Sequence, residues 1–226
     1  MKKQVSLPFM IAGILFTTCL LISNILAVKI ISIGPWAAPA GILVFPLAYI
    51  INDVIAEVWG YRKARLIIWS GFAMNFLAIL LYMLAIHLPA APFWENQAAF
   101  SSILSSTPRI VAASLLAYLV GSFLNAWVLS RMKIASQGKN FGWRAIVSTL
   151  VGESADSVIF ILIAFAGVFS WHNLLWMILT QATLKTIYEI LILPVTAYVV
   201  SRIKSIVNED VYDTDLSYNP FRIGEI

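Results

Sequence analysis

The sequence predicts an all-α integral membrane protein whose six transmembrane helices form one bundle. Of its 226 residues, 61% are hydrophobic and only 12% are charged, against about 25% charged in an ordinary soluble domain. The mean hydropathy is +0.88, and the chain contains stretches of about 20 apolar residues, the length that crosses ~30 Å of hydrocarbon. A soluble fold of this size could not bury so much apolar surface.

The apolar stretches follow one another with short connections. The first is predicted over residues 5–28, and it is too long for the apolar region of a signal peptide, so we interpret it as a retained helix. The other five spans are predicted over residues 38–59, 66–88, 110–129, 145–169 and 174–200. Aromatic residues after the third span favour a short interfacial helix. One transporter domain would thus cover residues 1–204, followed by a polar tail over residues 205–226.

Basic residues predict the orientation of the spans. Most Lys and Arg residues fall in the N-terminal segment, in the second and fourth connections and in the tail, which six crossings place on one side. The positive-inside rule then predicts that both termini are cytoplasmic. This topology explains the net charge of +4 without a nucleic-acid partner. With this topology the first three spans and the last three spans would cross the membrane in opposite directions, as in inverted repeats.

Ionisable residues inside the predicted spans indicate a functional site, because they are costly in hydrocarbon and usually face a polar interior. They are spaced three or four residues apart, which places each pair on one helix face. We expect the three polar stripes to converge on one cavity, with Lys29 toward the outer end. The pairs are Asp53 with Glu57, Glu153 with Asp156, and Lys185 with Glu189.

The predicted intramembrane charges do not balance, since five acids face two lysines. Glu57 could be solvated or paired with Arg62 or Lys63. The deeper acids would still require a proton or a cation, which is typical of a coupled transport site. The alternative is that Lys185 and Glu189 form a buried ion pair that only fixes helix packing.

Aromatic residues divide into two predicted groups. Tryptophans near the span ends are expected to be interfacial anchors: Trp36, Trp59, Trp69, Trp143 and Trp171. Aromatic side chains within the charged spans either pack normally or form a stacking surface for a flat ligand. These are Phe45, Tyr49, Phe160 and Tyr188.

Catalytic motifs are missing from the sequence. The only histidines are His87 and His172, there is no HExxH motif, and no GxSxG or phosphate-binding loop occurs. The single Cys19 gives neither a disulfide nor a cysteine metal site. No cofactor or metal is therefore expected. Aspartyl chemistry stays open, but the sequence favours transport over catalysis.

The run over residues 45–65, FPLAYIINDVIAEVWGYRKAR, resembles the signature FPxxYxxxDxxxExxGxxxAR of the queuosine precursor transporters, also called the vitamin uptake transporter family. The resemblance covers essentially the whole chain. It departs from the family at Asn125, where many members carry an acid. Further matching positions are Ser23-Asn24 with Lys29, Pro108-Arg109, Glu153-Ser154-Ala155-Asp156, Lys185 with Glu189 and Pro194, Tyr212-Asp213, and Asn219-Pro220-Phe221.

The resemblance implies inner-membrane uptake of a 7-deazaguanine base, a cyano or aminomethyl precursor of the tRNA nucleoside queuosine, by proton-coupled or facilitative transport. A guanine-like edge presents two parallel N–H donors that one carboxylate can accept. We expect Glu189 or Asp156 to accept this edge. The full set of expected substrate-binding residues is Asn24, Lys29, Phe45, Tyr49, Asp53, Glu153, Asp156, Lys185, Tyr188 and Glu189.

The other expected residues have supporting roles. Asn24 and Lys185 would contact the carbonyl of the base or orient the acid, and Asp53 and Glu153 would line the exit or take the coupling proton. Two rival functions stay open, a substrate-binding subunit of an ATP-driven uptake complex and an intramembrane hydrolase. The expected partners are the small deazaguanine substrate and membrane lipid, and a homodimer is also compatible with the sequence.

Overall fold

The structure, a computed structural model, describes residues 6–26, 28–33, 36–105, 108–167, 169–214 and 217–221. Its elements are α1 (Leu7–Leu26), β1 (Ile30–Ile33), β2 (Trp36–Pro39), the 3-10 turn η1 (Ala40–Leu43), α2 (Phe45–His87), α3 (Gln97–Leu104), α4 (Pro108–Ala135), α5 (Phe141–Phe165) and α6 (Trp171–Val207). Five of these helices, α1, α2, α4, α5 and α6, are long and apolar enough to cross a membrane. The chain is therefore a helical membrane protein, as predicted.

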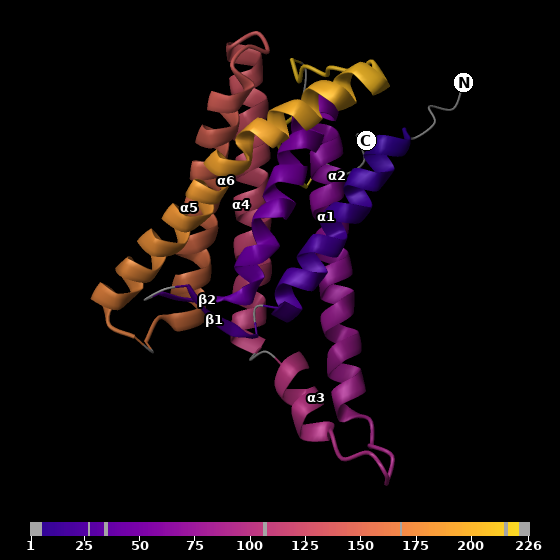
Figure 1. Cartoon of the computed structure of the whole chain (residues 1–226), viewed down its shortest axis with the longest axis vertical. Coiled ribbons are helices and arrows are strands. Elements are labelled where there is room, and N and C mark those ends of the chain that lie inside the picture. Colours follow the sequence, from indigo (N-terminus) through magenta and orange to yellow (C-terminus); the bar gives the residue numbers. More distant parts are fainter. Residues whose placement is uncertain are drawn as a thin grey trace.

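Helix α2 is broken at Gly60, where φ is 80° and ψ is 173°. The second and third predicted spans lie on the two sides of this break. Figure 1 shows the chain rising from β2, reversing within α2 and returning toward α3. A connection was predicted over residues 60–65, but Tyr61 already begins the second part of α2. The left-handed φ favours glycine, which has no Cβ to strain.

The start of the second span differs from the prediction. Helix α2 begins at Phe45 rather than near residue 38, with Pro46 in its first turn, a position that proline tolerates because the N–H there has no helical partner. The preceding residues form an antiparallel hairpin in which Ile30 pairs with Pro39 and Ile33 with Trp36. This hairpin was not predicted, because its residues are as apolar as a membrane helix.

Helices α2, α4, α5 and α6 form the centre of the bundle, and α1 packs against α2. Helix α4 contacts both α2 and α5, and α6 contacts α5 and α2. A Cβ atom added to Gly152 would lie 2.8 Å from the carbonyl oxygen of Gly121. The absence of these side chains lets the backbones of α4 and α5 touch, as small residues do in membrane bundles.

The predicted tryptophan anchors have different environments. Trp143 and Trp171 are 65% and 71% exposed, as interfacial side chains would be. Trp59 is instead buried, and its ring lies 5.3 Å from that of Phe9 in α1. The anchor prediction is therefore wrong for Trp59, because the Gly60 break turns this span end into the protein core.

Several predictions fall on residues outside the described part of the chain. Lys2, Lys3 and Arg222, which were counted for the orientation, are among them. The side chains of Trp36 and Arg109 are likewise outside the described residues. The predicted interfacial helix corresponds to α3, which has no buried residue.

Candidate functional site

Polar side chains from α2, α4, α5 and α6 meet in the interior of the bundle. We call this group the inner cluster; it consists of Asp53, Asn125, Thr149, Glu153, Asp156, Lys185 and Glu189, all buried. At its centre, Lys185 Nζ lies 2.7 Å from Glu153 Oε2 and 2.6 Å from Asp156 Oδ2. The three-residue spacing of the two acids puts both on the face of α5 that meets α6.

Lys185 therefore pairs with two acids of α5. The alternative interpretation, an isolated Lys185–Glu189 pair, is wrong, since within the described residues Lys185 forms ion pairs with Glu153 and Asp156 and none with Glu189. A single ammonium held by two carboxylates leaves the cluster with an excess of acid groups. That excess was predicted from the sequence.

Asp53 and Glu189 supply the remaining carboxyl groups. Asp53 accepts hydrogen bonds from neutral donors, Asn125 Nδ2 at 2.5 Å and Thr149 Oγ1 at 3.5 Å. Glu189 is only 1% exposed, and its Oε1 has no hydrogen-bond partner among the described residues. It lies one helical turn after Lys185 on α6. A buried acceptor without a donor is costly, so the Glu189 carboxyl is suited to bind a ligand or a proton.

Two of the predicted aromatic residues lie at the inner cluster. The Phe45 ring is 4.4 Å from Lys185 Nζ, and the ring of buried Tyr49 is 5.5 Å from that of Phe45. Phe160 packs against Phe165 instead, and Tyr188 is half-buried. An aromatic face thus adjoins the charged groups, an arrangement that can hold a flat ring with polar edges.

Asn24 and Lys29 are not brought together with the inner cluster. Asn24 lies on α1, is exposed and donates a hydrogen bond to Asn75 Oδ1 at 2.5 Å. Lys29 is exposed just before β1. Their sequence positions near the end of the first span could not reveal that α1 packs mainly against α2.

Glu57 belongs to a second polar group, which we call the Glu57 cluster: Glu57, Lys133, Arg144, Lys204 and Asp210. The Glu57 side chain is fully buried. It accepts hydrogen bonds from Arg144 at 2.5 and 3.0 Å and from Lys204 at 2.7 Å. The expected solvation or pairing of Glu57 with Arg62 or Lys63 is therefore wrong.

The local geometry explains the different partners of Glu57. Arg62 and Lys63 follow the Gly60 break, so they no longer share a helix face with Glu57. Lys63 lies over the Phe9 ring, 4.7 Å from its centroid. From the sequence, Arg144 was expected only as a basic residue of the fourth connection and Lys204 only as one of the tail, although a buried carboxylate requires cationic partners.

Asp210 closes the Glu57 cluster from the tail. Its Oδ1 lies 2.5 Å from Lys133 Nζ and 2.9 Å from Lys204 Nζ. Partial burial raises the pKa of Asp210, but the hydrogen bonds from the two ammonium groups outweigh it and hold this pKa below its ordinary value of 3.8.

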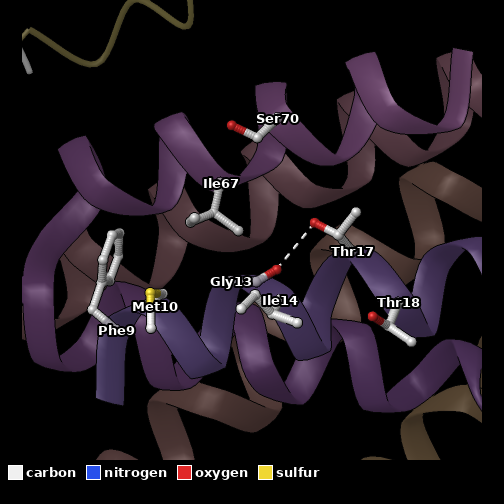
Figure 2. A pocket seen from close by; sticks show the side chains of 8 residues that line it. All are labelled: Phe9, Met10, Gly13, Ile14, Thr17, Thr18, Ile67 and Ser70. Atoms are coloured by element: carbon white, nitrogen blue, oxygen red, sulfur yellow. Dashed lines mark hydrogen bonds between the residues drawn. The ribbon is translucent and has the colours of Figure 1, made fainter. Parts of the chain in front are cut away.

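A groove of about 420 Å³ lies elsewhere, between α1 and the second part of α2. Figure 2 shows its lining, which is mostly apolar and includes none of the inner-cluster residues. Its Thr17 and Ser70 hydroxyls donate to carbonyls of their own helices, at 3.0 and 2.9 Å. The groove therefore offers little for polar recognition. In the described part of the chain, no group of His, Cys, Asp and Glu side chains could hold a metal ion.

Comparison with protein families gives a match over residues 39–199 to the family described as "Putative vitamin uptake transporter". The chain belongs to this family. It is therefore a transporter rather than an enzyme. The region shared with the vitamin uptake transporters contains the whole inner cluster, whereas Asn24, Lys29 and the tail lie outside it.

Curated relatives of this vitamin uptake transporter carry related names. The chain is 24% identical over 173 residues, 76% of each chain, to the "Probable queuosine precursor transporter" of Bacillus subtilis (strain 168). It is 29% identical over 143 residues, 63% of this chain and 62% of the relative, to the "Queuosine precursor transporter" of Escherichia coli (strain K12). No solved structure matches the chain.

Proposed function

We propose that this protein takes up a queuosine precursor, a 7-deazaguanine-type base, across the bacterial inner membrane. The names of the curated relatives support the substrate class. The observation that carries the proposal is the buried Glu189 carboxyl, whose Oε1 has no hydrogen-bond donor in the described part of the chain. One helical turn before it on α6, Lys185 contacts the Phe45 ring. Such a carboxyl group can accept the paired N–H donors of a guanine-like edge.

The proposed topology has six crossings with both termini in the cytoplasm. The crossings are α1, the two parts of α2, α4, α5 and α6. The first three crossings form one half of the bundle and the last three form the other, inverted half. The reversal within α2 supports this count. In Figure 1 the turn within α2, the α4–α5 turn and the end of α6 lie at one end of the bundle, and these segments carry most basic residues.

Within the inner cluster, we assign substrate recognition to Glu189. Asp156 is less suited to this role because it already binds Lys185. Lys185 in turn holds Glu153 and Asp156 in place, and its ammonium approaches the Phe45 ring. Phe45 and Tyr49 provide the surface on which the flat base stacks. Asn24, Lys29 and Tyr188 stay predictions from the sequence.

Coupling to protons is assigned to Asp53, with Glu153 as a second candidate. Asp53 is fully buried, and its hydrogen bonds come from neutral Asn125 and Thr149. A buried carboxyl without a cationic partner is a natural proton-binding group in a secondary transporter. The facilitative mode and the ATP-driven subunit are the alternatives.

Uptake of a labelled 7-deazaguanine precursor into membrane vesicles, with and without a proton gradient, tests the proposal. Glu189→Gln should lower uptake by about 10- to 100-fold, the equivalent of one charge-assisted hydrogen-bond pair. The matched control is Glu95→Gln, which removes an exposed acid in the α2–α3 connection.

The outcomes separate the parts of the proposal. No uptake by wild-type vesicles would refute the substrate class. Equal uptake with and without the gradient would refute proton coupling alone. Full uptake by the Glu189→Gln variant would refute the recognition role of this carboxyl.

A further inference from the structure

The residues after α6 return to the bundle and lie across the Gly60 break. We call residues 210–214 and 217–221 the tail strap. Asp213 Oδ2 accepts hydrogen bonds from the backbone N–H of Tyr61 at 2.9 Å and from Ser130 Oγ at 2.5 Å. The N–H of Val211 donates to the carbonyl oxygen of Val58 at 3.2 Å. The strap therefore satisfies backbone groups that a broken helix leaves without partners.

The tail strap occupies the space directly beside Gly60. A Cβ atom added to Gly60 would lie 2.8 Å from Asp213 Oδ1 and 2.9 Å from Val211 Cγ1. Glycine at this position thus allows both the left-handed turn and the close approach of the strap.

The second part of the strap follows α2 beyond the break. Buried Arg65 donates from Nη1 to the carbonyl oxygens of Ser217 at 3.3 Å and Asn219 at 2.7 Å. Trp69 Nε1 donates to the carbonyl oxygen of Pro220 at 2.8 Å. Trp69 is half-buried, and its role as a membrane anchor stays a prediction.

The first part of the strap ties α2 to α4 and α6. Lys133 Nζ donates to Asp210 Oδ1, to the carbonyl oxygen of Val211 at 2.7 Å and to that of Glu57 at 2.5 Å. Lys204 of α6 bridges Asp210 and Glu57. One short segment thus links three helices at a single end of the bundle.

We propose that the tail strap acts as a latch. It holds α2, α4 and α6 together at the end of the bundle that contains the Gly60 break, until substrate leaves there toward the cytoplasm. Alternating access requires the helices at one end of a transporter to separate. Asp210, whose side chain is 43% exposed, makes solvent-accessible contacts that can break and re-form. Glu57 lies one helical turn from Asp53, so the latch adjoins the inner cluster. The inference rests on the proposed transport function.

Side-specific labelling tests the latch without requiring a substrate. The single native cysteine is removed by Cys19→Ala, and Thr149→Cys, at a buried position within the inner cluster, reports access to the cluster. A membrane-impermeant maleimide is applied to inside-out and right-side-out vesicles. Asp210→Asn and Asp213→Asn each weaken the strap, and Glu209→Gln is the control because it neutralises the exposed neighbouring acid.

Both strap variants should be labelled about tenfold faster than the reference protein in inside-out vesicles, the shift expected from one lost charge-assisted hydrogen bond. Labelling in right-side-out vesicles and in the control should not change. Unchanged labelling from both faces, or an equal increase from both, would overturn the latch, since equal increases indicate general loosening. Because labelling needs no precursor, the result is independent of the uptake experiment.

Discussion

Replacing Arg144 by methionine should destabilise the protein by about 3 kcal/mol. Arg144 donates to both oxygens of Glu57, at 2.5 and 3.0 Å, and both side chains are buried. Removing one partner of a buried ion pair typically costs about 3–5 kcal/mol, because the other charge is left without compensation. Lys204 remains 2.7 Å from Glu57, which places the expected loss at the lower end of that range.

Reversible unfolding in mixed detergent micelles, followed by tryptophan fluorescence, measures this loss. Lys139→Met is the matched control, because Lys139 is exposed in the neighbouring turn and should change the free energy of unfolding by less than about 0.5 kcal/mol. Adding Glu57→Gln to Arg144→Met should restore part of the stability. Strict additivity of the two changes, or a loss below about 1 kcal/mol for Arg144→Met, would refute the buried pair.

Three further predictions concern the break, the inner cluster and the tail. Gly60→Ala should lower the unfolding temperature more than Gly167→Ala. Both glycines have φ near +80°, which costs alanine about 1–3 kcal/mol, but an added Cβ would lie 2.8 Å from Asp213 at Gly60 and would meet no atom within 4 Å at Gly167. Equal effects would contradict this. Lys185→Met should reduce precursor uptake at least about tenfold, because two buried acids lose their cation; Lys139→Met is the uptake control. The stability difference between wild type and Asp210→Asn should persist from about pH 8 to about pH 5 and shrink only as pH falls below 3.8. The reason is that the pKa of Asp210 is lowered in the folded protein, so its carboxylate stabilises the fold until it is protonated. Loss of the difference near neutral pH would contradict this.

The sequence predicted the inner cluster because hydrocarbon restricts where charges can lie. Glu153 and Asp156 share a helix face by spacing, and an unpaired Lys185 would be costly in a membrane, so their meeting follows from simple rules. The same rules predicted the carboxyl excess. They could not choose between Glu189 and the α5 acids as partners of Lys185, since that choice depends on how α5 and α6 cross.

Features that depend on backbone conformation or on main-chain recognition were not predictable. The Gly60 break occupies one residue, and the basic residues after it resemble a loop in composition. Arg65 and Trp69 bind carbonyl oxygens of the tail. Because every residue has a carbonyl oxygen, the amino-acid sequence of the tail does not show which residues accept these hydrogen bonds. The hairpin before α2 is apolar like a membrane helix, and only its pairing distinguishes it.

The sequence predicts an excess of acids over lysines inside the spans, and the two polar clusters show in which of them this excess lies. Glu57 is neutralised by Lys133, Arg144 and Lys204, basic residues that the sequence placed outside the spans. The inner cluster keeps four carboxyl groups against Lys185 alone. A net deficit of cations in a buried site can be relieved by protons or by a ligand. The coupling proton proposed for Asp53 and the substrate edge proposed for Glu189 would each relieve this excess at a different carboxyl group of the same cluster, which would link their binding electrostatically.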